Sequence, residues 1–151
     1  MSRTSKAQFD AAFPDETACL TALLRMRFGG TEIWCPGCTT RARFHAMRRR
    51  RGYACQNCGY HLFPCAETIF ARSRTPLRTW FRAMHLMSGA GKGVTAKALE
   101  RELGVTYKTA WRMAQLLRRL MASADYRGAV AGLGPGLAFA ALTRLATRAT
   151  P

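Results

Sequence analysis

The residues best suited to chemistry in this chain are four cysteines arranged as two Cys-x-x-Cys pairs. Cys35 and Cys38 form the first pair, Cys55 and Cys58 form the second, and sixteen residues separate them. This spacing is typical of a four-thiolate zinc site, because each pair can place two sulfurs on adjacent corners of a tetrahedron. All four positions around the metal would be filled, with none open for water. The sequence therefore predicts one structural Zn²⁺ ion.

The charge of the chain indicates what it binds. Its 151 residues carry a formal net charge of +16, with a pI near 11.0, and arginine outnumbers lysine twenty to four. Such a balance favours a polyanionic partner, with nucleic acid as the leading candidate. Ribosomal, membrane-surface and heparin-like partners remain open on charge alone. Nothing in the composition indicates a small-molecule substrate.

The sequence also indicates the cellular compartment of the chain. The N-terminal residues lack the apolar stretch of a secretory signal, and no run of about 18 apolar residues could span a bilayer. We therefore expect no membrane partner and a cytoplasmic, nucleoid-associated protein. In that reducing compartment, paired cysteines favour zinc over disulfides. His45, His61, Cys19 and Cys65 are spare candidate ligands, with the histidines expected near the surface and Cys19 in the core.

Short elements must position the cysteines. Residues 14–28 predict a helix that starts near Pro14 and ends at Gly29 and Gly30. Residues 31–70 alternate as short strands around the two pairs, which is the layout of a zinc ribbon. A run of four arginines forms either a solvated turn or a hairpin tip that contacts phosphate. The run is Arg48, Arg49, Arg50 and Arg51. We favour the phosphate contact, because adjacent cations repel one another without an anion.

A helix-turn-helix is predicted downstream. Thr75-Pro76 begins a helix, Thr95 caps a second, Gly104 makes a tight turn, and Thr106 caps a third. The start of this third helix would offer DNA contacts, and Trp111 is expected to pack inside. Glu100 stands where such motifs prefer a small residue, so it must point outward or pair with a basic neighbour. A helical hairpin with a solvated basic face is the alternative. The candidate DNA contacts are Tyr107, Lys108, Thr109 and Arg112.

The order of these parts resembles the N-terminal half of bacterial insertion-sequence transposases that open with a transposase zinc ribbon. The resemblance covers roughly residues 9–122 and is carried by the two cysteine pairs, Thr68-Ile-Phe, and the Thr109-Ala-Trp-Arg-Met string. It implies binding to the terminal inverted repeats of the element, with Cys35, Cys38, Cys55 and Cys58 as zinc ligands. Glu67 departs from the family, which usually has glycine before Thr-Ile-Phe.

The same resemblance implies a downstream RNase H-like domain with an acidic DDE triad. Such a centre needs three carboxylates holding two divalent ions, and only Asp125 follows Met121. We therefore expect a chain that is not an enzyme as it stands. The Gly/Ala/Arg-rich residues 124–151 are expected to be a low-complexity tail, disordered or read out of frame, in a truncated transposase.

These observations predict an α+β chain, in which a small four-cysteine zinc ribbon of short antiparallel strands precedes a helix-turn-helix. Its parts would be an N-terminal helical segment (1–30), the ribbon (31–72), the helix-turn-helix (73–123) and the tail (124–151). The expected function is binding of double-stranded DNA at transposon ends, with a second copy or the intact transposase as further partner. Two alternatives stay open: a stand-alone zinc-ribbon transcriptional regulator or RNA-binding module, and an adaptor for a separately encoded catalytic subunit.

Overall fold

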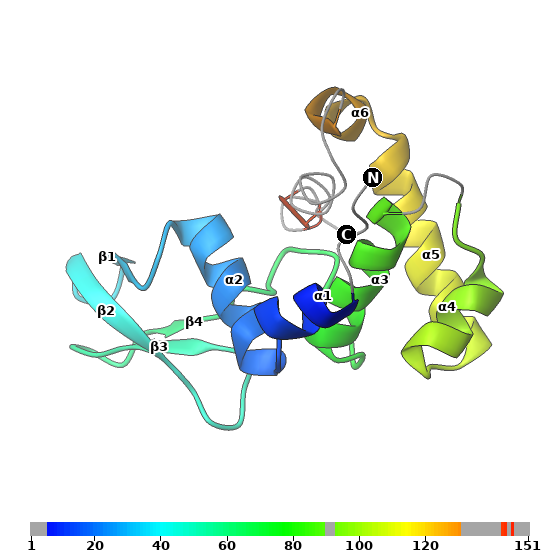
Figure 1. Cartoon of the computed structure of the whole chain (residues 1–151). Coiled ribbons are helices and arrows are strands. Elements are labelled where there is room, and N and C mark those ends of the chain that lie inside the picture. The colour runs from blue at the N-terminus through cyan, green and yellow to red at the C-terminus, as the bar shows by residue number, and fades with distance from the viewer. Residues whose placement is uncertain (1–5, 90–92, 131–142, 145, 147–151) are drawn as a thin grey trace.

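A small antiparallel sheet and a group of helices share one continuous core in the computed structural model, which describes residues 6–89, 93–130, 143, 144 and 146 (Figure 1). None of the helices within these residues has the length and apolar character needed to cross a membrane. The predicted α+β class is confirmed. The elements in chain order are α1 (Lys6–Ala12), α2 (Glu16–Phe28), β1 (Glu32–Cys35), β2 (Thr40–Ala46), β3 (Tyr53–Cys55), β4 (His61–Leu62), α3 (Leu77–Gly89), α4 (Ala96–Leu103), α5 (Tyr107–Ala122) and α6 (Ala124–Val130).

The four strands form an antiparallel meander in the order β1-β2-β3-β4. Side chains alternate between the two faces with the period of two that strands impose. One face is buried, and the opposite face of β1 and β2 is open to solvent. The buried residues of the first three strands are Ile33, Cys35, Ala42, Phe44, Tyr53 and Cys55. The strands lie where the sequence predicted them, which confirms the ribbon layout.

Helix α2 begins two residues later than Pro14 suggested. The Asp15 side chain accepts a hydrogen bond from the Ala18 amide at 2.8 Å, so Asp15 caps the helix. At the other end Gly29 adopts a left-handed conformation with φ of 84° and closes the last turn onto the Arg25 carbonyl. One face of α2 is buried, and it consists of Cys19, Leu20, Leu23 and Leu24.

Helix α1 is not predicted by the sequence pattern. This helix has seven residues and buries only Phe9, so it lacks the apolar periodicity that would reveal it. It is held by Arg78 of α3, whose guanidinium pairs with Asp10 and donates to the Phe13 carbonyl at 2.7 Å. Phe9 also packs against His85 of α3, with ring centroids 5.2 Å apart. Tertiary contacts, rather than local propensity, therefore define α1.

Helix α2 joins the sheet to the helices (Figure 1). On the sheet side its Thr21 hydroxyl shares a 2.8 Å hydrogen bond with the Tyr53 hydroxyl of β3. On the helical side the Glu16 carboxylate accepts from the Leu77 and Arg78 amides, which are the first amides of α3. A carboxylate at a helix N-terminus satisfies unpaired amides and complements the helix dipole. One residue of α2 thus caps another helix 61 positions along the chain.

The predicted capping residues of the helix-turn-helix are confirmed. Thr95 and Thr106 cap α4 and α5 with their hydroxyl groups, and Gly104 ends α4 with φ of 67°. Helices α3, α4 and α5 pack on one another through apolar side chains. The completely or almost completely buried ones are Leu77, Phe81, Met84, Leu99, Ala110, Met113, Ala114 and Leu117. Residues 124–130 form α6, and most of the predicted tail lies outside the described residues.

An irregular segment from residue 63 to 75 runs between the sheet and α3. Thr68 is fully buried, and its hydroxyl donates to the Cys65 carbonyl at 2.6 Å. Glu67 stands just before it with φ of 62°, a left-handed conformation that disfavours side chains with a Cβ. This explains why a glycine suits the position: its backbone reaches that region without steric cost.

Replacing Glu67 with glycine is expected to stabilise the fold by about 1 kcal/mol, because it removes the Cβ from a left-handed residue. The exposed Glu67 side chain has little packing to lose. Urea unfolding of the variant would measure the gain. Glu67→Ala is the matched control, since it also removes the carboxylate but keeps the Cβ. Equal stability of the glycine and alanine variants would contradict the strain.

Replacing Glu16 with glutamine is expected to destabilise the fold by about 2 kcal/mol, because two amides of α3 lose a charged acceptor. Thermal unfolding would measure this loss. Glu32→Gln serves as the control, since the Glu32–Arg43 pair spans 3.6 Å with both side chains about two-thirds exposed. Such a pair contributes little, so this variant should unfold near the wild-type temperature. Similar losses in both variants would argue against a special role for Glu16.

Candidate metal centre and nucleic-acid interface

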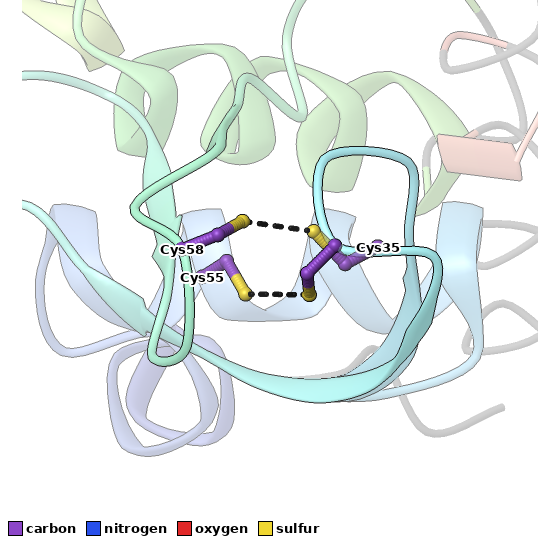
Figure 2. Close-up of side chains that lie close together, drawn as sticks. Cys35, Cys55 and Cys58 are labelled. Atoms are coloured by element: carbon purple, nitrogen blue, oxygen red, sulfur yellow. Dashed lines mark hydrogen bonds between the residues drawn. The ribbon is translucent and has the colours of Figure 1, made fainter.

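The four cysteines of the two pairs converge at one end of the sheet. Their sulfur atoms all lie within 4.8 Å of one another. Cys35 faces Cys58 with 3.5 Å between the sulfurs, and Cys38 faces Cys55 at 3.9 Å. Figure 2 shows these two contacts bridging the turns, so each contact joins one pair to the other. The convergence predicted from the spacing is confirmed.

The sulfur geometry fits a tetrahedral zinc ion. With zinc–sulfur bonds of about 2.3 Å, the sulfurs of a tetrahedral site lie about 3.8 Å apart. The Cys35–Cys58 and Cys38–Cys55 distances, 3.5 and 3.9 Å, fall on either side of that value. A disulfide would need about 2.05 Å, and all four cysteines are free. These sulfurs would therefore act as thiolates toward a soft divalent cation.

Backbone geometry brings the two turns into contact. Gly37 lies so close to the opposite turn that a Cβ there would sit 2.9 Å from the Cys58 sulfur and 3.0 Å from the Tyr60 Cβ. Gly59 adopts φ of 76° and returns the chain toward β4, with its amide bonded to the Cys55 carbonyl at 3.0 Å. Glycine is needed at the first position for space and at the second for conformation.

The four sulfurs are close enough to shift one another's ionisation. Desolvation and hydrogen bonding with the other sulfurs raise the pKa of the Cys38 thiol to about 12. Four thiolates could not share this space at neutral pH without a compensating positive charge. On the Cys55 side, the backbone amides of Asn57 and Cys58 donate to the sulfur, as in other thiolate metal sites.

The other candidate ligands lie outside the cluster. His45 and His61 are exposed, as the sequence predicted. Cys19 is fully buried on α2, where burial raises the pKa of its thiol to about 12. Burial also raises the pKa of Cys65. These two cysteines are therefore neutral core residues at physiological pH.

The arginine run forms the tip of the β2–β3 hairpin, where the Met47 amide bonds to the Gly52 carbonyl at 2.9 Å. Arg48, Arg49 and Arg50 are exposed there. Arg51 differs from them, because its guanidinium donates to the Ser73 and Thr75 carbonyls at 3.2 and 3.0 Å. That side chain connects the sheet to the segment before α3. The exposed guanidinium groups of Arg48, Arg49 and Arg50 are thus left to make the proposed phosphate contact.

The start of α5 carries the other predicted DNA contacts. Tyr107, Lys108 and Arg112 are exposed, whereas Thr109 is half-buried. The Thr109 hydroxyl accepts a hydrogen bond from the Thr106 hydroxyl at 3.0 Å, so it takes part in the helix cap. The Glu100 carboxylate forms an ion pair with Lys97 at 2.8 Å, which is one of the two arrangements that the sequence predicts for it.

The prediction that Trp111 packs inside is wrong. Its side chain is 50% exposed, the same fraction as Tyr107 one turn earlier. Helix α5 is buried through Ala110, Met113 and Ala114, and small or flexible side chains there let it approach α3 and α4 closely. Trp111 follows Ala110 by about 100° around the axis, which carries it off that face.

Comparisons with known proteins agree with this geometry. Residues 14–61 match the family described as a transposase zinc-ribbon domain. Over 106 residues, or 69% of the chain, the sequence is 29% identical to an uncharacterized protein in transposable element ISH50 of Halobacterium salinarum. The chain spans about a third of that relative's length, 34%. No solved structure matches the chain.

Removing one metal ligand is expected to unfold the sheet. Cys38→Ser or Cys55→Ser should lose bound zinc and the ordered structure of residues 31–70, because structural zinc contributes on the order of 10 kcal/mol to such domains. Elemental analysis should find one zinc per wild-type chain, and amide NMR would follow the sheet. Cys65→Ala, a buried cysteine outside the cluster, should retain both. A sheet that survives complete removal of metal by a chelator would contradict a structural role.

Proposed function

With residues 14–61 as a transposase zinc-ribbon domain, we propose that the chain binds double-stranded DNA at the terminal inverted repeats of an insertion sequence. The observation that carries the proposal is the exposed face of α5 in a helix-turn-helix. Helix α5 runs from Tyr107 to Ala122 with four cations and no carboxylate. In this motif the second helix enters the major groove with its N-terminal residues toward the bases.

The helix-turn-helix is held in a defined arrangement by its own polar contacts. The Arg118 guanidinium of α5 donates to the Val94 carbonyl just before α4, at 2.7 Å. On α4, Lys97 compensates the negative charge of Glu100. Lys108 and Arg112 are then available to DNA at the start of α5. A rigid helix pair that presents cations on one face suits a duplex.

The arginines of the hairpin tip would provide a second contact. Several other arginines donate to backbone carbonyls of this protein: Arg27, Arg41, Arg78, Arg118 and, within the run itself, Arg51. Arg48, Arg49 and Arg50 are exposed at the β2–β3 turn instead. We assign them to phosphate, which would position the ribbon on the duplex without reading its sequence. The zinc ion would hold this hairpin in shape.

We assign DNA recognition, and not strand transfer, to this chain. Among the residues that the structure describes, the four cysteines are the only group suited to hold a metal ion. A DDE centre would hold two divalent ions with carboxylates. Cleavage and joining would then come from a DDE domain outside the described residues.

A binding assay with the element's terminal repeat tests the proposal. The double variant Lys108→Ala, Arg112→Ala is expected to lose about a hundredfold in affinity, since each contact contributes about 1–3 kcal/mol. If both side chains contact phosphates, the slope of log affinity against log salt concentration should decrease in magnitude by about two. Arg25→Ala removes an exposed charge from α2 and should change little. Equal affinity of the wild type for unrelated duplexes, or a preference for single-stranded RNA, would overturn the proposal.

A further inference from the structure

Two exposed aromatic side chains lie next to each other on α5. Tyr107 and Trp111 are each 50% exposed. Four residues separate them, which places them about 40° apart around the helix and about 6 Å apart along it. Both lie at the border of the face that buries Ala110, Met113 and Ala114, with Trp111 further from it than Tyr107. They form an apolar strip, here called the aromatic strip, in the first half of the helix.

The charges around the aromatic strip indicate its partner. Lys108 and Arg112 each follow one of the aromatic residues, and both are exposed. Because α5 contains no carboxylate, its own exposed side combines apolar area with positive charge. A second copy of this chain, with a net charge of +16, would be repelled from it. A polyanion that also offers apolar groups fits the surface better.

The major groove of DNA offers such a combination. The phosphates on both sides are anionic, and the C5-methyl of thymine is the apolar group displayed on its floor. We propose that Trp111 and Tyr107 contact thymine methyl groups in the target duplex and so help to select its sequence. This inference rests on the proposed function. The 6 Å offset along the helix corresponds to about two base-pair steps, so the contacted thymines lie close together.

The test uses the duplex that the wild-type chain selects from a random pool, prepared with thymine or with deoxyuridine. Deoxyuridine lacks only the methyl group, so base pairing and phosphate contacts are unchanged. Wild type is expected to bind the thymine duplex about fourfold more tightly for each contacted methyl. Trp111→Ala should lose the preference at one position, and Tyr107→Ala at a neighbouring one. Because both side chains are exposed, the variants should keep the wild-type unfolding temperature.

Trp34→Ala is the matched control. Trp34 is an exposed tryptophan on β1, 61% exposed and far from α5 in the fold (Figure 1). This variant should keep the full preference for thymine over deoxyuridine, whatever its absolute affinity.

Two results would overturn the inference while leaving the proposed function in place. One is equal binding of the selected thymine and deoxyuridine duplexes by wild type. The other is an unchanged preference in both the Trp111→Ala and Tyr107→Ala variants, which would assign the aromatic strip to another contact, such as a protein interface. Failure to select any duplex from the pool would instead overturn the proposed function itself.

Discussion

The convergence of four cysteine sulfurs within 4.8 Å is the constraint on which the ribbon depends. The longest of the four strands has seven residues and the shortest has two. Sheets of this size bury too little apolar surface to be stable alone, so a cross-link between their turns has to compensate. A tetrahedral zinc ion would join one pair to the other at the Cys35–Cys58 and Cys38–Cys55 contacts. The closed hairpin then presents a surface on which α2 can pack.

Arginine has two physical roles in this protein. A guanidinium group carries five donors, so one side chain can satisfy several backbone carbonyls that lack a partner in irregular structure. Arg27 donates to the Pro64 and Ala66 carbonyls, and Arg51 donates to those of Ser73 and Thr75. Both ends of the segment between the sheet and α3 are thereby fixed. The net charge is consequently an incomplete guide to the proposed DNA interface, because some of the charged side chains stabilise the fold instead.

The relation between the ribbon and the helices follows from long-range polar contacts of α2 and α3. Glu16 caps α3, and Arg78 at the start of α3 holds α1 through Asp10 and the Phe13 carbonyl. Rigid attachment of this kind would serve the proposed DNA binding, because two contact surfaces on one duplex must keep a fixed separation. The strands of the β2–β3 hairpin and helix α5 contribute to one continuous core, which would hold the two proposed contact surfaces at a fixed separation.

The sequence by itself determined the features that depend on neighbours along the chain. Cysteine spacing predicted the metal cluster, and Thr95, Gly104 and Thr106 predicted the limits of α4 and α5, because caps and turns are closed by residues three or four positions away. Only the tertiary structure decided that α1 forms, that Arg51 is bound to carbonyls and that Trp111 faces solvent. Each of these depends on partners distant in sequence: α1 on Arg78, Arg51 on Ser73 and Thr75, and Trp111 on which face of α5 packs against α3 and α4.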